Sequence, residues 1–245
     1  MTNDPAAGLP GPAQTRPGNA LSSQPASPER EFEKRSYLRD YAAMMDATPH
    51  PSLLIDHSWN VTAANRGYET LFREAGPHPT AMPGQNFLRF VLFHPDAADV
   101  LREHETSWCL PLLAQFSAAL ETHAQDATLQ DIRRHIADDA LMNAAYQQGL
   151  PRWMRLVGAR ALDHDGAVRP LHHPDPPWGR TTCRVVTETP STLQSLGLTR
   201  MTLVLHAQST APSVPQQREA PSARPHGTTG RRPAAPHLRV VPAGP

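Results

Sequence analysis

The spacing of apolar residues changes several times along this chain, and each change marks a predicted element. In residues 30–47 the apolar positions recur at near-helical intervals: Phe32, Leu38, Tyr41 and Met45. This spacing predicts a helix with one apolar stripe and a charged opposite face. Pro28 suits the first turn of such a helix, where its missing N–H has no intrahelical partner to lose.

A β-hairpin and a short helix are predicted next. Residues 53–55 are apolar, residues 56–58 are typical of a polar turn, and residues 59–63 alternate between apolar and polar positions. Asn65 can accept backbone N–H bonds at the start of a helix over residues 66–75. The order is therefore strand, tight turn, strand and capped helix.

The most hydrophobic stretch of the chain spans residues 87–93 and leads into a long predicted helix that starts at Asp96. The apolar face of this helix repeats every four or seven residues: Leu101, Trp108, Leu112, Phe116 and Leu120. Pro111 lies inside this pattern and should kink the helix or split it in two. Two shorter helical patterns follow at residues 129–136 and 141–146.

From Pro151 onward Gly, Pro and Asp interrupt the helical pattern, and the last periodic runs are strand-like. Residues 180–189 are rich in Thr and Val, and residues 199–207 alternate. With the hairpin, these runs predict a sheet of four or five strands and a helical block inserted between its halves (residues 85–148). The predicted fold class is α+β, an antiparallel sheet and helices forming one pair of layers.

Composition places this fold in residues 30–207. All fourteen aromatic residues lie between Phe32 and Trp178, whereas the two ends hold 14 of the 27 prolines. A segment without large apolar groups cannot offset the entropy of ordering its backbone. Residues 1–29, rich in Pro, Ala and Ser, and residues 208–245, rich in Pro and Arg, are therefore predicted to be disordered.

Charge and targeting signals narrow the class of protein. The 23 Lys and Arg residues balance 23 Asp and Glu residues, so the overall charge favours no acidic partner. The tail after residue 207 carries five Arg and one Glu, which leaves weak nucleic-acid contact open beside a merely solvated tail. No signal peptide or membrane-length apolar run is visible, and we expect a cytoplasmic protein without membrane contact.

Candidate catalytic and metal-binding residues are sparse. Cys109 and Cys183 form no paired motif and stand in apolar runs, where a buried reduced thiol is expected. One polar cluster could bind a metal: Asp163, His164, Asp165, His172, His173 and Asp175. Adjacent histidines in an extended segment point to opposite faces, so a turn and an exposed strand start explain the cluster better. Without a phosphate loop or nucleophile elbow, we expect no metal site, no catalytic residue and no cofactor.

An apolar set offers a better candidate binding site. It comes from two consecutive elements, with strand residues expected opposite, and could line a cavity: Leu54, Phe87, Phe90, Phe93, Trp108, Leu112, Phe116 and Leu203. Arg89 lies within the run and could meet a carboxylate head group or extend to solvent. A solid core with no cavity is the other interpretation of the same spacing.

Several phrases of the chain, taken in order, resemble the MmyB-like ligand-binding domain of actinobacterial transcription regulators. They include RSYLRDYAAMMDATPHPSLLIDHSWNVTAANRGYETLF, NFLRFVLFHPDAADVL, TSWCLPLLAQFSAAL, WGRTTCRVVTET and LTRMTLVLHA. The resemblance covers about residues 35–207 and implies a PAS-like fold, in which a small antiparallel sheet and a helical segment enclose a cavity. Relatives usually carry a helix-turn-helix DNA-binding domain before this one. The Pro-rich residues that precede it here have no helical period, so we expect no specific DNA binding by this chain alone.

The resemblance implies a non-enzymatic sensor that binds a small hydrophobic ligand, such as a fatty acid, and regulates transcription through protein contacts. A homodimer, or a heterodimer with a related regulator, would provide that contact. The helix at residues 30–47 is the expected dimer surface, with Tyr37, Tyr41 and Met44 as candidate anchors. The alternative is a ligand-free interaction protein that titrates or scaffolds a related regulator.

Overall fold

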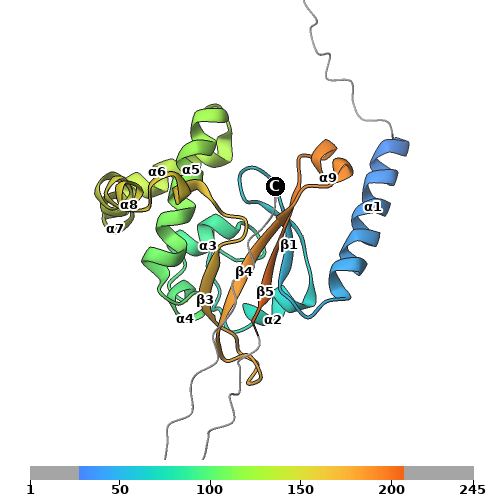
Figure 1. Ribbon diagram of the computed structural model, residues 1–245. Helices are drawn as coiled ribbons and strands as arrows, with labels where there is room; N and C mark the ends of the chain where they lie inside the picture. The colour runs from blue at the N-terminus through green and yellow to red at the C-terminus, as the bar shows by residue number, and fades with distance from the viewer. Residues whose placement is uncertain (1–27, 207–245) are drawn as a thin grey trace, which may run out of the picture. The chain divides into compact units, whose positions relative to one another are not determined.

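The computed structural model, which describes residues 28–206, contains one antiparallel sheet of five strands in the order β2-β1-β5-β4-β3 (Figure 1). The strands are β1 (Ser52–Ile55), β2 (Val61–Ala64), β3 (Val168–His172), β4 (Arg180–Glu188) and β5 (Thr199–Leu205). The segments predicted to be disordered lie outside the described residues, except for Pro28 and Glu29, which begin the first helix.

The described chain also contains α-, π- and 3₁₀-helices. The α-helices are α1 (Pro28–Asp46), α2 (Arg66–Leu71), α3 (Phe87–Phe93), α4 (Ala97–Val100), α5 (Leu110–Thr122), α6 (Ala127–Asp138), α7 (Ala140–Ala144), α8 (Leu150–Val157) and α9 (Ser191–Ser195). Two π-helical segments, η1 (His104–Cys109) and η2 (Ala145–Gly149), run directly into α5 and α8, and η3 (Gly158–Leu162) is a 3₁₀-helix.

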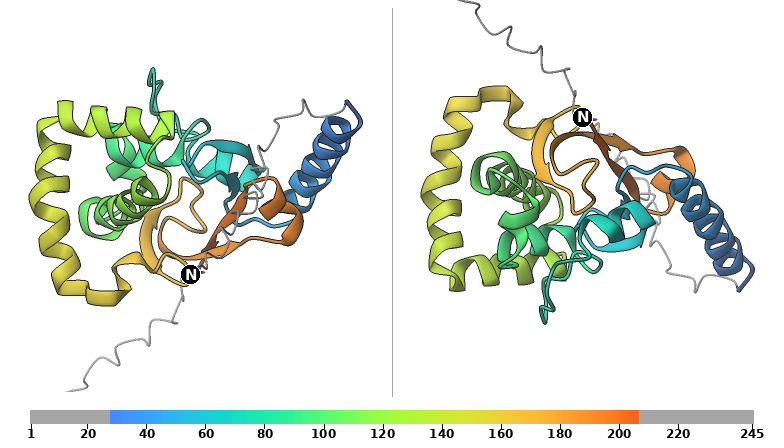
Figure 2. Two further views of the ribbon diagram at one scale, coloured as in Figure 1. Left: turned by 90° about the horizontal axis from the view of Figure 1, so that it is seen from above. Right: turned by 90° about the horizontal axis from the view of Figure 1, so that it is seen from below.

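The centre of the sheet joins the two ends of the domain. β1 pairs with β5 antiparallel, with Leu53 opposite Met201 and Leu54 opposite Arg200. All helices from α2 to η3 lie in the long connection between β2 and β3, which occupy the two edges of the sheet. Figures 1 and 2 show most of this connection, α3 to α8, gathered on one side of the sheet and α1 on the other.

The two faces of the sheet have separate cores. On the inner face, Leu53, Met201 and Leu203 join the large cluster that also contains the side chains of α3, η1 and α5. On the outer face, Leu54 packs in a smaller cluster of residues from α1, α9 and the loop after it: Tyr41, Met45, Leu193 and Leu198. Successive strand residues point to opposite faces, so this alternation is what a sheet buried on both sides requires. The α+β, PAS-like prediction is confirmed.

Proline positions explain where the helical connection departs from the sequence prediction. We expected Pro111 to kink or split a long helix that starts at Asp96. The break lies earlier, at Leu101–Glu103, where Glu103 has a φ of 50°. Pro111 is the second residue of α5 and follows the π-helical turn η1 without interruption. A proline lacks an N–H and its ring crowds the carbonyl four residues back, and a wider π turn relieves that contact.

The sequence pattern did not predict the helix α8, and the cause is again a proline. Pro151 suggests the end of the helical pattern, yet it is the second residue of α8 and again follows a π-helical segment, η2. Proline is tolerated in the first turn of an α-helix. The helical run therefore continues to Leu162, and with α6 it runs around α5 (Figure 2).

Asn65 ties three elements together at the start of the connection. Its Oδ1 accepts hydrogen bonds from Tyr68 N (2.9 Å), which caps α2, and from Ser52 N (2.8 Å) in β1. Its Nδ2 donates to Met45 O (3.0 Å) at the end of α1 and to His50 O (2.9 Å). The predicted cap therefore also holds the loop between α1 and β1.

Replacing Asn65 should destabilise the whole domain. Asn65→Ala removes five side-chain hydrogen bonds, one of them a long contact to Thr48 O (3.5 Å), from a site that is 1% exposed. We therefore expect the free energy of unfolding to fall by about 3 kcal/mol. Urea unfolding followed by circular dichroism measures this change. Asn143→Ala, at a partly buried residue of α7 whose side chain has no hydrogen bond within residues 28–206, is the matched control. Equal effects of the two substitutions would contradict the role given to Asn65.

Candidate ligand-binding site

Six of the predicted lining residues do come together on the inner face of the sheet. Phe87 and Phe90 on α3, Trp108 on η1, Leu112 and Phe116 on α5, and Leu203 on β5 are all fully buried in one cluster. The aromatic rings among them pack against one another and against neighbouring rings. The ring centroids of Phe87 and Trp108 lie 6.5 Å apart, and those of Phe72 and Phe90 lie 4.8 Å apart. Five surface pockets of 370–680 Å³ occur around the described residues, and none is lined by these six.

Three other candidates have different surroundings. Leu54 faces the outer side of the sheet and cannot share a wall with Leu203. Phe93 lies partly buried at the edge of the cluster, with its ring edge-on to His135 at 6.0 Å. The guanidinium of Arg89 pairs with Asp131 and with His135 Nδ1 (2.8 Å), which ties α3 to α6. Arg89 therefore meets a carboxylate of the chain itself, whereas its expected contact with a ligand head group stays a prediction.

The residues expected on a dimer surface are mostly engaged within the chain. Tyr41 is 9% exposed and packs with Met45 and Leu54 against the outer face of the sheet. Tyr37 packs at the edge of the same cluster, so of the three candidates only Met44 is exposed. The reason is geometric, because the apolar stripe of α1 is the stripe that covers the sheet.

A buried arginine that sequence reasoning missed lies in the inner face of the sheet. Arg169 on β3 is 3% exposed, and its guanidinium carbon lies 5.2 Å from the centre of the Trp108 ring. The Trp108 indole is held in place because its Nε1 donates to Pro170 O (2.9 Å). Arg169 Nη2 donates to His164 Nδ1 (3.1 Å), whereas Nη1 has no hydrogen-bond partner within residues 28–206.

The electrostatics of this cluster leave a positive charge uncompensated. Burial lowers the pKa of Arg169 to about 10, so its guanidinium is still protonated at neutral pH. Burial, and next to it the charge of Arg169, lower the pKa of His164 to about 3, so its imidazole is neutral. Since arginine only donates, His164 Nδ1 accepts, and its Nε2 carries the proton that faces Met201 Sδ at 3.1 Å. No carboxylate of the described chain lies within 4.0 Å of Arg169.

The register of β3 and β4 contains the signal that would have revealed Arg169. Arg169 and Leu171 are two residues apart in a strand and therefore share a face, and Leu171 is core. Arg169 also stands opposite Cys183, whose thiol pKa burial raises to about 12. Because Arg169 shares a strand face with Leu171 and stands opposite Cys183, this pattern predicts that its charge is buried.

The polar side chains at residues 163–175 do not converge on a common point. His164 points into the core, whereas His173 Nδ1 accepts from Asp175 N (3.0 Å) within a turn. Asp175 pairs with Arg73 at 2.8 Å. Across residues 28–206, no three His, Cys, Asp or Glu side chains are placed to share a metal ion, and no helix there has the length and apolar character to cross a membrane.

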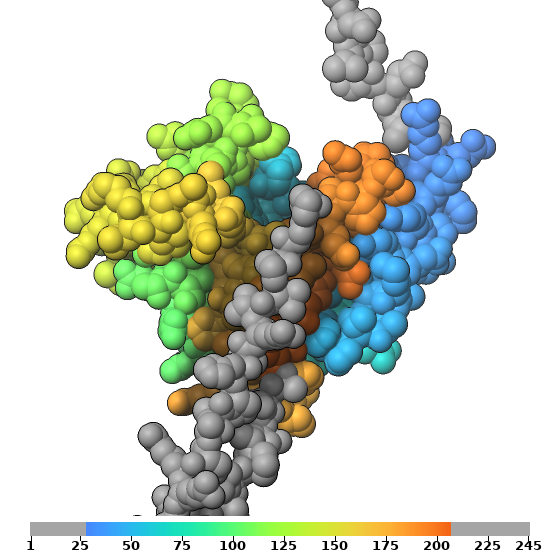
Figure 3. Space-filling model, viewed as in Figure 1, coloured from blue at the N-terminus to red at the C-terminus, as the bar shows by residue number. Residues whose placement is uncertain are grey.

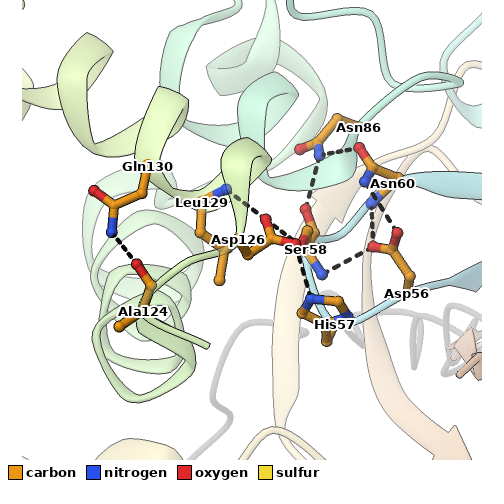
Figure 4. A network of polar contacts seen from close by, with 9 residues as sticks. All are labelled: Asp56, His57, Ser58, Asn60, Asn86, Ala124, Asp126, Leu129 and Gln130. Atoms are coloured by element: carbon orange, nitrogen blue, oxygen red, sulfur yellow. Dashed lines mark hydrogen bonds and ion pairs between the residues drawn. The ribbon is translucent and has the colours of Figure 1, made fainter. Parts of the chain in front are cut away.

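A polar network fastens the helical connection to the hairpin turn (Figure 4). Asp56 Oδ1 accepts from Ser58 N (2.8 Å) and Asn60 N (2.9 Å), which shapes the turn. Asp126 caps α6 by accepting from Leu129 N (2.9 Å), and it also accepts from Ser58 Oγ (3.0 Å) and faces His57 Nε2 (3.1 Å). One carboxylate thus anchors α6, part of the cover of the candidate site, to the sheet.

Comparison with known proteins adds a family to this geometry. The family model described as MmyB-like transcription regulator ligand binding domain matches residues 39–218. No curated protein matches the chain. The matched range contains all five strands, the helical connection and Arg169.

Removing the Asp126 carboxylate should weaken the domain in a pH-dependent way. The hydrogen bond from Leu129 N, with those from Ser58 and His57, lowers the pKa of Asp126 below its usual value. A carboxylate with a lowered pKa stabilises the fold above its unfolded-state pKa, about 4, and this contribution is lost as pH falls through the folded-state pKa. We expect Asp126→Ala to lower the free energy of unfolding by about 1–2 kcal/mol at pH 7, and the difference from wild type to shrink below pH 4.

Urea unfolding between pH 7 and pH 3 measures this difference. Asp138→Ala, at an exposed acid of α6 without a side-chain hydrogen bond in the described chain, should change stability by less than about 0.5 kcal/mol. If the difference in free energy of unfolding between wild type and Asp126→Ala is the same at pH 3 as at pH 7, the carboxylate is not its source.

Proposed function

We propose that this chain, which belongs to the family of MmyB-like transcription regulator ligand binding domains, is a non-enzymatic regulatory domain for a small amphipathic anion. The ligand would lie between the inner face of the sheet and η1–α5, with its head group on Arg169. A fatty-acid-like molecule has this chemistry, an apolar body with one negative charge.

The buried charge of Arg169 is the observation that carries the proposal. An ion removed from water without a counter-ion destabilises a protein by several kcal/mol. Folded chains normally pair such a group, as Arg89 is paired with Asp131. Arg169 donates to a neutral histidine and lies against an aromatic ring, and its Nη1 has no hydrogen-bond partner within residues 28–206. An anionic head group would supply both the missing charge and the missing acceptor.

The surroundings of Arg169 suit an apolar ligand body. Trp108 lies against the guanidinium, and Leu112, Phe116 and Leu203 continue the same cluster. Since the wall residues contact one another, binding includes a movement of η1–α5 away from the sheet.

Replacing Arg169 with methionine tests this site in the full chain. We expect wild type to retain an anionic amphipath detectable by native mass spectrometry, and Arg169→Met to retain one equivalent fewer. Arg169→Met should also weaken added decanoate at this site at least about tenfold. Because a buried unpaired charge is removed, the ligand-free variant should unfold at equal or higher urea than ligand-free wild type, so lost binding does not reflect lost folding.

Arg200→Met is the matched control for this experiment. Arg200 lies on β5 opposite Leu54 and pairs with Glu188 (3.3 Å), away from the inner face. It should retain the ligand. An Arg169→Met variant that binds as many ligand equivalents as wild type, or equal losses in both variants, would exclude Arg169 as the anchor.

A second function, a ligand-free interaction protein, is favoured by the close packing of the predicted wall. In that case regulation would come from self-association or from pairing with a related regulator. The exposed apolar residues of α1, Phe32 (69% exposed) and Met44 (48% exposed), support a contact through this helix.

For this second function we expect Met44→Glu to weaken self-association at least about tenfold, because a charge buried in an apolar contact costs about 1.4 kcal/mol or more. Sedimentation velocity across a concentration series measures the change. Glu33→Gln, at an exposed polar residue of α1, is the control and should leave association unchanged. A wild-type chain that stays monomeric and holds a ligand would contradict this second function and support the first.

A further inference from the structure

A pocket of about 680 Å³ lies between η1 and the helical arm, which we define as residues 140–162 (α7, η2, α8 and η3). Its apolar lining includes Cys109, Leu141 and Met142, and its polar lining includes Glu105, Arg152 and Arg155. The volume is within the usual range of small-molecule sites, about 300–1,000 Å³. This arm pocket is separate from the Arg169 cluster, because neither Arg169 nor Trp108 lines it.

Two prolines shape the arm pocket. Pro111 and Pro151 each follow a π-helical segment, and these two segments, η1 and η2, face each other across the pocket. A π turn is wider than an α turn and displaces the side chains that follow it. The concavity is therefore built from covalent constraints of the sequence and does not depend on a loop.

The apolar side of the arm pocket is left uncovered. Leu141 lines it and is 79% exposed, an unusual state for a leucine beside a concave surface. Figure 3 shows the arm at the surface of the molecule (yellow). An aliphatic group lying over Leu141 and Met142 would remove this area from water.

The charged side of the arm pocket favours an anion. Arg152 and Arg155 are exposed, and neither has an ion pair or a side-chain hydrogen bond within residues 28–206. The arm itself contains no Asp or Glu. Across the pocket, burial lowers the pKa of His104, whose Nε2 donates to Val91 O (2.7 Å). Glu105 is an acid in the pocket lining, and its charge offsets one of the two arginines.

From this arrangement we infer that the arm pocket is a second binding site, for a small molecule with an aliphatic body and an anionic head. The aliphatic body packs on Leu141 and Met142, and the head group is held by Arg152 and Arg155. The inference stands independently of the proposed function, since it uses none of the residues of the Arg169 site.

Isothermal titration with decanoate tests the arm pocket in the full chain. Arg169→Met removes the head-group contact of the inner site, so decanoate bound by this variant reports the arm pocket. We expect Arg169→Met to bind one equivalent, and the added pair Arg152→Gln and Arg155→Gln to weaken that binding at least about tenfold. Decyltrimethylammonium, with the same chain and the opposite charge, should bind Arg169→Met at least about tenfold more weakly than decanoate.

Two further substitutions control the test. Arg160→Gln changes an exposed arginine of the same arm that does not line the pocket, and it should leave binding unchanged. Leu141→Gln alters an exposed side chain, so it should fold normally and weaken both probes.

The outcomes separate the two sites. Loss of all decanoate binding in Arg169→Met overturns the arm pocket and leaves the proposed function intact. Binding in Arg169→Met that is equal for both head groups, or insensitive to Arg152→Gln and Arg155→Gln, also overturns it. One equivalent retained by wild type and Arg169→Met alike, and lost with the two arm arginines, supports the arm pocket and contradicts the Arg169 site.

Discussion

Pairing of β1 with β5 is the constraint on which the rest of the structure depends. It joins residues 52–55 to residues 199–202, and it leaves the long helical connection between two edge strands of one sheet. The connection has to return from β2 to β3, and its apolar residues are buried only if it covers a face of the sheet. The inner core, η1 and α5 above the strands, follows from that requirement, and α1 covers the outer face.

The sequence predicted the parts of this fold that rest on local pattern. The hairpin, the Asn65 cap, the late strands and the inward face of α5 follow from periodicity and capping chemistry, which act within a few residues. The prolines at 111 and 151 could not be placed from pattern, because a proline ends one helix and begins another with equal ease. Which occurs depends on whether the preceding turn can widen, and tertiary packing decides that.

The candidate site was predicted in its apolar half and missed in its polar half. Phe87, Trp108 and Leu203 meet as expected, because apolar residues at regular spacing end in one core. The charged residue was assigned to Arg89, which lies in the hydrophobic run, whereas the uncompensated charge belongs to Arg169. Whether a buried arginine has a carboxylate beside it is a long-range property. Asp131 reaches Arg89 from 42 residues away, and no acid of residues 28–206 pairs with Arg169.

The segment η1 contacts both arginine sites proposed above, the Arg169 cluster and the arm pocket. Trp108 and Cys109 are adjacent in a π-helical turn, and they serve different sides of it: Trp108 lies against Arg169, and Cys109 lines the arm pocket. A ligand that separates η1–α5 from the sheet moves both residues, because a short helical turn shifts as a unit. The affinities of the two sites are then coupled, and by thermodynamic reciprocity each ligand changes the binding of the other by the same factor. A domain with this geometry can report two small anions, or two positions of one, through the movement of a single helical segment.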